Sequence, residues 1–385
     1  MLVGYKSSHD KEIEGVWFNR GIVRRGMHFL IGKVEEFTGM QYLIQPFRNT
    51  FLHHPWVKSA DIIHLHNLHG NYFSLSILPK LNAIAPLVWS LYDMWPMSDH
   101  CAYPVMWGCN IWKTGTGKCP SLFDYPPIRR DTGAYLWKRK KAVYEKCDIS
   151  FVGPSEWMCK TARESPLIGH FPIHCIPQGI DTDLFSPGDK VEARKTLGIP
   201  VDAQVVLISA IPNAPRKGLE YFIQALKYVK REPRPLILVV GSRGLFPPEI
   251  TNKFPMREMG YLHSSEIFHT CFVASDISVL PTLADNLPLT ILDSLSTEVP
   301  VVSFDVGGVP EAVKTDETGY VARYKDAKDL AHGIDDLLKD PARLKKIAQS
   351  ARQLMTERYT LDQQAAGYEA LYAQVMDLRR QASGV

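Results

Sequence analysis

Two cationic side chains in the second half of the chain have the types and the position that anion binding requires. Arg216 and Lys217 follow an apolar run, "VVLISA" (205–210), and precede a segment of helical periodicity, "LEYFIQAL" (219–226). Adjacent fixed cations suit a diphosphate, because Arg can donate two parallel hydrogen bonds and Lys adds a point charge. The alternative is a solvated Lys/Arg pair at a loop tip, which the two residues taken alone favour.

Two carboxylates, Asp285 and Asp293, lie on either side of Pro288 and raise the question of an acid/base pair. Pro288 suits the first turn of a helix, which we expect to continue to Ser296. The free N–H groups of that helix would point toward Asn286–Leu289 and bind a phosphate. Each acid can then contact a different part of one ligand, for example ribose hydroxyls. Equally compatible with the spacing is that Asp285 caps the helix and Asp293 is solvated.

The elements that must position these residues form an α/β pattern. Short apolar, β-branched runs are each followed by a longer segment with helical periodicity, which is typical of parallel sheets covered on both faces. The runs are "IIHLH" (62–66), "PLVWSL" (86–91), "DISFVG" (148–153), "IHCIP" (173–177), "VVLISA" (205–210), "PLILVVG" (235–241), "ISVLP" (277–281) and "PVVSF" (300–304).

A chain of 385 residues is too long for one typical core, so we expect two domains. The aperiodic segment "PQGIDTDLFSPGDK" (177–190) indicates the boundary. We predict two doubly wound, Rossmann-like domains, 1–180 and 181–360, that face each other across a cleft. Ligands bind outside the carboxyl ends of such strands. The C-terminal segment is helical, and a last helix at about 361–383 is long enough to pack on the first domain.

Composition excludes several classes of protein. The formal net charge of +3 is too small to indicate a nucleic-acid partner. The longest apolar stretch is too short to span a bilayer, and no signal peptide follows Met1, so we expect a cytoplasmic protein. Cys101, Cys109 and Cys119 cluster near His100, but their spacing matches no standard zinc pattern. We therefore expect buried reduced thiols and no metal.

The motifs in the second half carry a family resemblance. The run from "PRKG" through "VLPTLADNLPLTILDSLSTEVPVVSFDVGGVPEAV" to "TGYVA" resembles the donor-binding half of the retaining family-4 glycosyltransferases of GT-B fold. "IPQGIDTDLFSP" is similar to their interdomain signature. "LHNLHG" (65–70), "YDMWPMSDHCAYP" (92–104) and "WGCNIWKTGTGKCP" (107–120) resemble a bacterial branch that builds exopolysaccharide and cell-surface glycans.

The resemblance implies a role for each candidate residue. The family's basic pair for the donor diphosphate falls at Arg216 and Lys217, and its two acidic positions fall at Asp285, beside the donor sugar, and Asp293, on the ribose. The backbone of Asn286, Leu287, Pro288, Leu289 and Thr290 would contact the phosphates and the sugar. Gly241, at the end of "LILVVG", would let the chain pass close to the nucleotide.

The implied reaction moves a sugar from a nucleoside-diphosphate sugar to an acceptor, with retention at the anomeric carbon. The family uses neither a metal nor another cofactor, so Arg216, Lys217 and the helix N-terminus would stabilise the departing diphosphate. No protein nucleophile is required if the acceptor attacks from the face that the leaving group vacates. The chain would thus be a hexosyltransferase whose acidic residues bind rather than hydrolyse.

Three departures from the family pattern bear on activity. Both acidic positions carry Asp in place of Glu. Tyr92 stands in "SLYDMW" where the family commonly has His, and His66, His69 and His100 are possible substitutes, each more readily explained as structural. The family's first strand, glycine-rich loop and helix would precede "MLVGYKSS", which resembles the second strand, so we expect the first domain to lack them.

The acceptor is less clearly indicated than the donor. A glycan or lipid-linked acceptor fits the bacterial branch, and the basic, aromatic segment 129–146 could contact the inner face of the plasma membrane. Equally, Trp137 and Tyr144 could face the core of a solvated helix. Two alternatives to transfer remain open: a nucleotide-sugar epimerase of GT-B fold, and a catalytically impaired protein that only binds sugar nucleotides.

Overall fold

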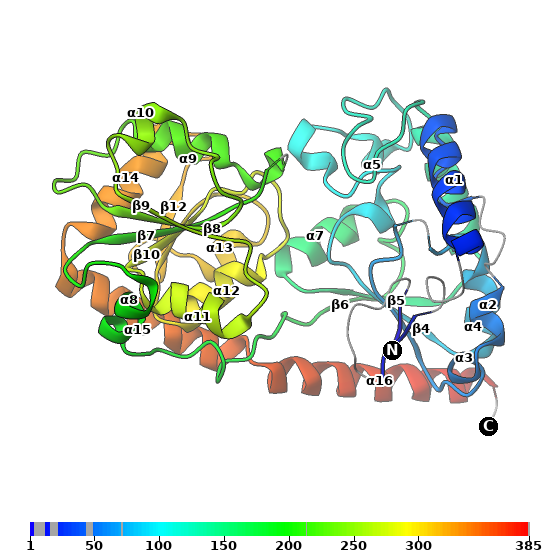
Figure 1. The fold of residues 1–385 in the computed structure, drawn as a ribbon. Coiled ribbons are helices and arrows are strands. Elements are labelled where there is room, and N and C mark those ends of the chain that lie inside the picture. The colour runs from blue at the N-terminus through cyan, green and yellow to red at the C-terminus, as the bar shows by residue number, and fades with distance from the viewer. Residues whose placement is uncertain (4–11, 16–21, 44–48, 71, 213, 384–385) are drawn as a thin grey trace. The chain divides into compact units, whose positions relative to one another are not determined.

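The computed structural model describes residues 1–385 except 4–11, 16–21, 44–48, 71, 213 and 384–385 (Figure 1). It divides into two compact units. The first unit comprises Met1–Pro154, Met158–Ile176 and Tyr368–Val385, and the second comprises Ser155–Trp157 and Pro177–Gly367. Both units are parallel-sheet α/β structures, as the alternating sequence pattern predicts.

The first unit is built on a four-stranded parallel sheet. Its strand order is β3-β4-β5-β6, with β3 Ile63–Leu65, β4 Leu87–Ser90, β5 Ile149–Gly153 and β6 Ile173–Cys175. The two inner strands are buried along their whole length, which explains their continuous apolar sequences. The helices along this part of the chain are α1 Ile22–Thr38, α2 Thr50–His53, α3 Pro55–Lys58, α4 Leu78–Ile84, α5 Ile111–Thr114, α6 Gly133–Tyr144 and α7 Glu156–Glu164.

The second unit is built on a six-stranded parallel sheet of order β12-β11-β10-β7-β8-β9. Chain order reverses at β7 and β10, which lie side by side at the centre, and this switch point is where open α/β sheets bind ligands. The strands are β7 Val205–Ala210, β8 Leu236–Gly241, β9 Met256–Gly260, β10 Ile277–Leu280, β11 Val301–Phe304 and β12 Gly319–Ala322. The helices are α8 Lys190–Leu197, α9 Leu219–Leu226, α10 Pro248–Thr251, α11 Ser265–Val273, α12 Leu289–Ser296, α13 Val309–Ala312, α14 Ala327–Leu338 and α15 Pro341–Arg358. The last helix, α16 Leu361–Ser383, begins in this unit and belongs to the first unit from Tyr368 onward.

The N-terminal strand differs from its expected place. Leu2–Val3 (β1) pairs with Glu14–Gly15 (β2) in a separate two-stranded sheet and does not join the four-stranded sheet of the first unit. The run "MLVGYKSS" offers only Leu2 and Val3 before Gly4, which is too short an apolar stretch to be buried between helices on both faces of a sheet. Residues 4–8 of that run lie outside the described residues.

The C-terminal helix α16 contributes residues to the core of the first unit. Leu371 and Val375 pack with Val88 of β4, Val152 of β5 and Ile176. Its polar side supports the same sheet: the Tyr372 hydroxyl lies 2.7 Å from His64 Nδ1, and the Tyr368 hydroxyl lies 2.7 Å from Ser90 Oγ. Burial lowers the pKa of His64 to about 3, so its imidazole is neutral in this network.

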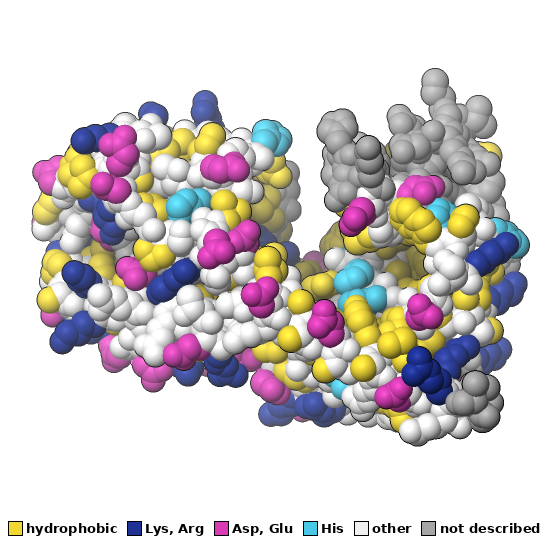
Figure 2. Space-filling view, turned by 90° about the horizontal axis from the view of Figure 1, so that it is seen from below, with side chains coloured by type: hydrophobic (Ala, Val, Ile, Leu, Met, Phe, Trp, Pro, Cys, Tyr) yellow, Lys and Arg dark blue, Asp and Glu magenta, His cyan; other side chains and the backbone are white. Residues whose placement is uncertain are grey.

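The surface charges are mixed in sign. Figure 2 shows Lys and Arg side chains interspersed with Asp and Glu over the face in view, rather than gathered into one basic area. Within the described part of the chain, no helix is long and apolar enough to cross a membrane.

Candidate functional site

One carboxylate holds both predicted cations. Asp285 Oδ2 lies 2.7 Å from Arg216 Nη1 and 2.8 Å from Lys217 Nζ, and it also accepts a hydrogen bond from Thr282 Oγ1 at 3.2 Å. The three charged side chains are 14% to 31% exposed, so this is not a pair of solvated cations at a loop tip. The structure therefore brings together three predicted site residues from two separate loops, one after β7 and the other after β10.

The backbone fixes these two loops against each other. Arg216 and Lys217 lie on a 3₁₀ turn, Pro215–Lys217, and Gly218 then starts helix α9 with a φ of +69°. A Cβ atom on Gly218 would lie 1.7 Å from the carbonyl oxygen of Pro281, so only glycine fits. The Leu283 N–H donates to the Arg216 carbonyl at 2.7 Å, and Arg216 Nη1 donates to the Ala284 carbonyl at 2.9 Å.

Helix α12 begins where the sequence predicts. Pro288 is its N-cap residue, with extended backbone, and the helix runs from Leu289 to Ser296. The N-cap residue Pro288 makes no side-chain hydrogen bond to this end, and the Asp285 carboxylate contacts Arg216, Lys217 and Thr282 instead of serving as the cap that the alternative interpretation required. The N-terminal N–H groups of α12 and its positive dipole end are therefore available to an anion.

The loop before α12 is held from inside the second unit. Leu287 is buried in a core cluster with Ile291 of α12, and Asn286 is also buried. The Asn286 carbonyl accepts a hydrogen bond from the Gly308 N–H at 2.6 Å. Leu289, in contrast, is 45% exposed at the start of the helix. Of the predicted phosphate-binding run, Asn286 and Leu287 thus anchor the loop, and the helix end beginning at Leu289 faces solvent.

Asp293 occupies a different environment from Asp285. It lies in the second turn of α12, and burial raises the pKa of its carboxyl group to about 7. The alternative of a solvated surface acid is therefore wrong for this residue. A carboxyl group that is half-protonated near neutral pH needs a partner to hold its charge, and ligand hydroxyl groups can supply the hydrogen bonds.

Gly241 is glycine for a reason that the sequence does not reveal. It ends β8 with a φ of +116°, and a Cβ atom there would lie 2.1 Å from the carbonyl oxygen of Ala210 on β7. The close approach in the described structure is thus to the neighbouring strand. Because β7 and β8 lie side by side, Gly241 ends at the same sheet edge as the loop that carries Arg216.

The first unit has its own polar cluster at the carboxyl ends of β3 and β4. His69 Nε2 lies 2.7 Å from Asp93 Oδ2, and His69 Nδ1 lies 3.1 Å from the Tyr125 hydroxyl. Tyr92, at the position where the family commonly has His, stacks on His66 with ring centroids 5.8 Å apart. A carboxylate paired with an imidazole can accept a proton from a hydroxyl group.

Sequence reasoning did not single out Asp93. It directly follows Tyr92 in "SLYDMW", and the position of an acid after a buried strand was the signal that could have found it. Its second oxygen accepts a hydrogen bond from the Trp95 N–H at 2.8 Å, which fixes the carboxylate.

The structure distinguishes between the two interpretations of segment 129–146, membrane contact and packing of its aromatic residues in the core. Helix α6 buries Trp137 and Tyr144, at 9% and 0% exposure, within the first unit. Tyr144 donates to the Pro96 carbonyl at 2.9 Å. These residues face the core, so the two aromatic side chains that would have anchored the segment in a membrane are not available to one.

Comparison with known proteins finds a family match within the second unit. Residues 202–340 match the model of the family described as "Glycosyl transferases group 1". The chain is 27% identical over 260 residues to the "Putative colanic acid biosynthesis glycosyl transferase WcaC" of Escherichia coli K12, which covers 63% of this chain and 59% of the relative. It is 29% identical to the D-inositol 3-phosphate glycosyltransferase of Stackebrandtia nassauensis, covering 46% of this chain and 43% of the relative.

Solved structures support the fold of the whole chain. Anabaena Alr3699/HepE in complex with UDP-glucose superimposes with a TM-score of 0.62 over 94% of this chain and 86% of its own, at 15% identity. The chain spans roughly half the length of the two curated relatives named above. The predicted GT-B fold class is confirmed, and the matching family model and the two relatives are glycosyltransferases by name.

Proposed function

We propose that this chain is a retaining glycosyltransferase that moves a sugar from a nucleoside-diphosphate sugar to a glycan or lipid-linked acceptor. The proposal rests mainly on one observation. Asp285 forms ion pairs with both Arg216 and Lys217, and it does so near the N-terminus of α12. Two cations and a helix end at the carboxyl edge of a parallel sheet suit a diphosphate group. HepE, which shares the fold, was solved in complex with UDP-glucose, and this supports a donor of that class.

The roles of the residues follow from the charge that develops in the reaction. The bond between the anomeric carbon and the diphosphate oxygen breaks, and negative charge grows on that oxygen. Arg216 and Lys217 stabilise this charge, while Asp285 keeps the two cations in place and lies beside the donor sugar. The acceptor oxygen bonds to the anomeric carbon and loses its proton. We infer no metal in this step, because the cations and the helix end supply the positive charge.

The nucleoside lies on the other side of the diphosphate. Asp293 accepts hydrogen bonds from the ribose hydroxyls, and the backbone between Asn286 and Thr290 contacts the phosphates and the sugar. Gly241 borders the nucleotide at the end of β8. In this arrangement the two acids have separate binding roles, and neither is a nucleophile.

The acceptor belongs to the cell surface in this proposal. The name of the Escherichia coli relative refers to colanic acid biosynthesis, which supports an exopolysaccharide or related glycan. Transfer then takes place in the cytoplasm, where nucleoside-diphosphate sugars are consumed, with any contact to the inner membrane face made without Trp137 and Tyr144.

A donor panel tests this function and its rivals. The full chain is incubated with nucleoside-diphosphate sugars, with and without membrane extract, and both free nucleotide and labelled sugar are followed. Transfer requires nucleotide release that depends on the acceptor. Epimerised sugar nucleotide without transfer would favour the epimerase, and binding without turnover would favour the impaired binding protein.

Lys217→Ala tests the diphosphate assignment directly. We expect about a 10- to 100-fold loss of affinity for UDP, since a buried charge-assisted contact to phosphate contributes roughly 1.5–3 kcal/mol. Lys227→Ala is the matched control, because Lys227 is an exposed lysine of the same unit, paired only with Glu249 in the contacts described. Unchanged UDP binding and turnover in Lys217→Ala would exclude Lys217 from the site.

A further inference from the structure

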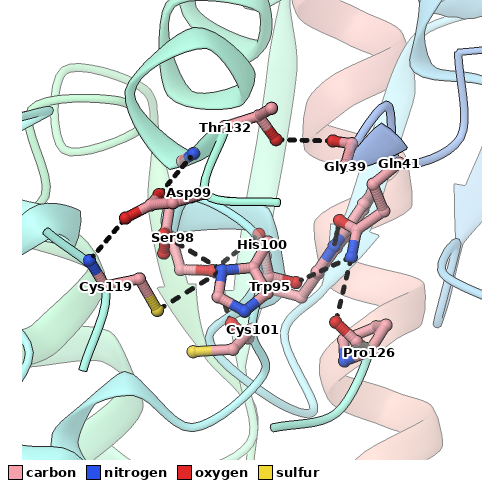
Figure 3. A network of polar contacts seen from close by, with 12 residues as sticks. Gly39, Gln41, Trp95, Ser98, Asp99, His100, Cys101, Cys119, Pro126 and Thr132 are labelled. Carbon is pink, nitrogen blue, oxygen red and sulfur yellow. Dashed lines mark hydrogen bonds and ion pairs between the residues drawn. The ribbon is translucent and has the colours of Figure 1, made fainter. Parts of the chain in front are cut away.

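A compact group of metal-binding side chains lies in the first unit, away in sequence from every donor-site residue. Among the described residues, Asp99, His100 and Cys119 place one potential ligand atom each within 4.8 Å of the others. His100 Nδ1 lies 3.1 Å from Asp99 Oδ2 and 4.0 Å from Cys119 Sγ (Figure 3). A tetrahedral ion with bonds of about 2.0–2.3 Å has ligand–ligand separations of roughly 3.3–3.8 Å, so these distances bracket those of a metal site.

Two atoms of this group have unmet hydrogen-bonding needs. Asp99 Oδ1 and His100 Nε2 are buried without a hydrogen-bond partner in the described part of the chain, and both residues are 0% exposed. A buried polar atom without a partner costs about 1–3 kcal/mol. A cation held by the Asp99 carboxylate would satisfy Oδ1, whereas His100 would bind it through Nδ1, the ring nitrogen that faces Asp99 and Cys119.

A second cysteine of the same segment lies beside this group. Cys109 and Cys119 pack in one buried cluster with Ile111.

We propose that Asp99, His100, Cys109 and Cys119 bind one zinc-type divalent ion, which fixes the irregular segment between β4 and α6. This segment, residues 91–132, contains only short helical turns and α5, and its backbone hydrogen bonds are those of turns and loops rather than of a sheet or a long helix. A closed set of four protein ligands with sulfur, nitrogen and oxygen donors is typical of structural zinc. The ion would act on folding of the first unit and takes no part in the proposed transfer step.

The proposed ion site differs from the expectation, based on cysteine spacing, of reduced thiols without a metal. Nine residues separate Cys109 from Cys119, and no CxxC pair is present, so no sequence pattern signals zinc. The fold, and not a short motif, brings Asp99 and His100 against Cys119.

Metal content of the full chain tests the proposal. Protein expressed with zinc and purified without chelator should retain one equivalent of zinc by elemental analysis. Replacement with Co²⁺ should give a sulfur-to-cobalt charge-transfer band and the visible absorption of a tetrahedral ion. Cys119→Ser should lose the ion, and Cys271→Ser, at a buried cysteine of the second unit, should keep it.

Further measurements separate the ligand set from its surroundings. The Cys101→Ser variant should keep one equivalent of zinc, because Cys101 is not one of the four proposed ligands. Loss of zinc from this variant would mean that Cys101, and not Cys109, is the second sulfur ligand. Chelation of the native protein should lower its Tm, which tests the site even if a variant fails to fold. Native protein without bound metal, or a Cys109–Cys119 disulfide detected as the loss of two hydrogens by mass spectrometry, would overturn the proposal.

Discussion

Asp293 and Asp285 are both acids of the donor loop, yet their surroundings give them opposite properties. Asp285 has two cations within 2.8 Å, whereas Asp293 is half-buried, and removal from water raises its pKa to about 7. The sequence spacing suggests a pair of similar acids. Only the fold reveals that the charge of Asp285 is balanced by two cations, whereas no described cation forms an ion pair with Asp293. This difference makes Asp293 the residue whose protonation should respond to the donor.

The raised pKa of Asp293 predicts a pH dependence of nucleotide binding. Hydrogen bonds from ribose hydroxyls favour the carboxylate, so binding should lower this pKa and release a proton. UDP affinity should therefore weaken as the pH falls below about 7, by up to tenfold per pH unit, because the protonated acid must first lose its proton. Calorimetric titration with UDP between about pH 5 and 8 measures the effect.

Asp293→Asn provides the control for this titration. The amide does not ionise, so the variant should lose the part of the pH dependence that belongs to Asp293 and retain the part that belongs to the phosphate groups of UDP. Affinity in the native protein that stays constant, or that increases toward low pH, would contradict a ribose contact through the Asp293 carboxylate.

At the scale of elements, the 3₁₀ turn before α9 positions the cations, and Gly218 sets its shape. Gly218 and Gly244 share a φ of +69°, but a Cβ atom would meet Pro281 O at 1.7 Å in the first case and nothing within 4 Å in the second. Gly244→Ala should cost about 1–2 kcal/mol for backbone strain alone. Gly218→Ala should cost clearly more and should also weaken UDP binding, because the turn carrying Arg216 and Lys217 must move.

Thermal unfolding and UDP titration of the two variants check this prediction. The comparison isolates the close contact with Pro281 from the left-handed backbone that both positions share. Equal losses of stability with unchanged UDP affinity would mean that the turn can shift without disturbing the site.

The elements that the sequence predicted best are those buried on both faces. All eight apolar runs named from the sequence contain a strand of the two sheets, and α12 ends at Ser296 as expected. The missed strands, β9 and β12, lie at the two edges of the larger sheet. β9 reads "MREMG", with Arg257 and Glu258 at its centre, because an edge strand need not be buried on both sides.

At the scale of the whole molecule, local pattern identifies site residues but not their partners. The family resemblance indicated Arg216, Lys217 and Asp285 separately, and their common contact depends on the adjacency of β7 and β10, which are far apart in sequence. The same holds for His69 with Asp93, and for His100 with Cys119. Such contacts are set by strand order and crossover connections, about which residue spacing carries no information.

Helix α16 is the element that extends from the second unit into the first, and it provides a test of whether the two units unfold independently. Leu371 is 4% exposed in the core of the first unit, whereas Leu378, two turns later on the same helix, is 55% exposed. Leu371→Ala should destabilise the first unit by about 2–5 kcal/mol, while Leu378→Ala should change stability by less than about 0.5 kcal/mol. Calorimetry of the Leu371→Ala variant should then separate two transitions, of which only the later one shifts upward with UDP. A single transition that UDP shifts as a whole would mean that the units unfold together.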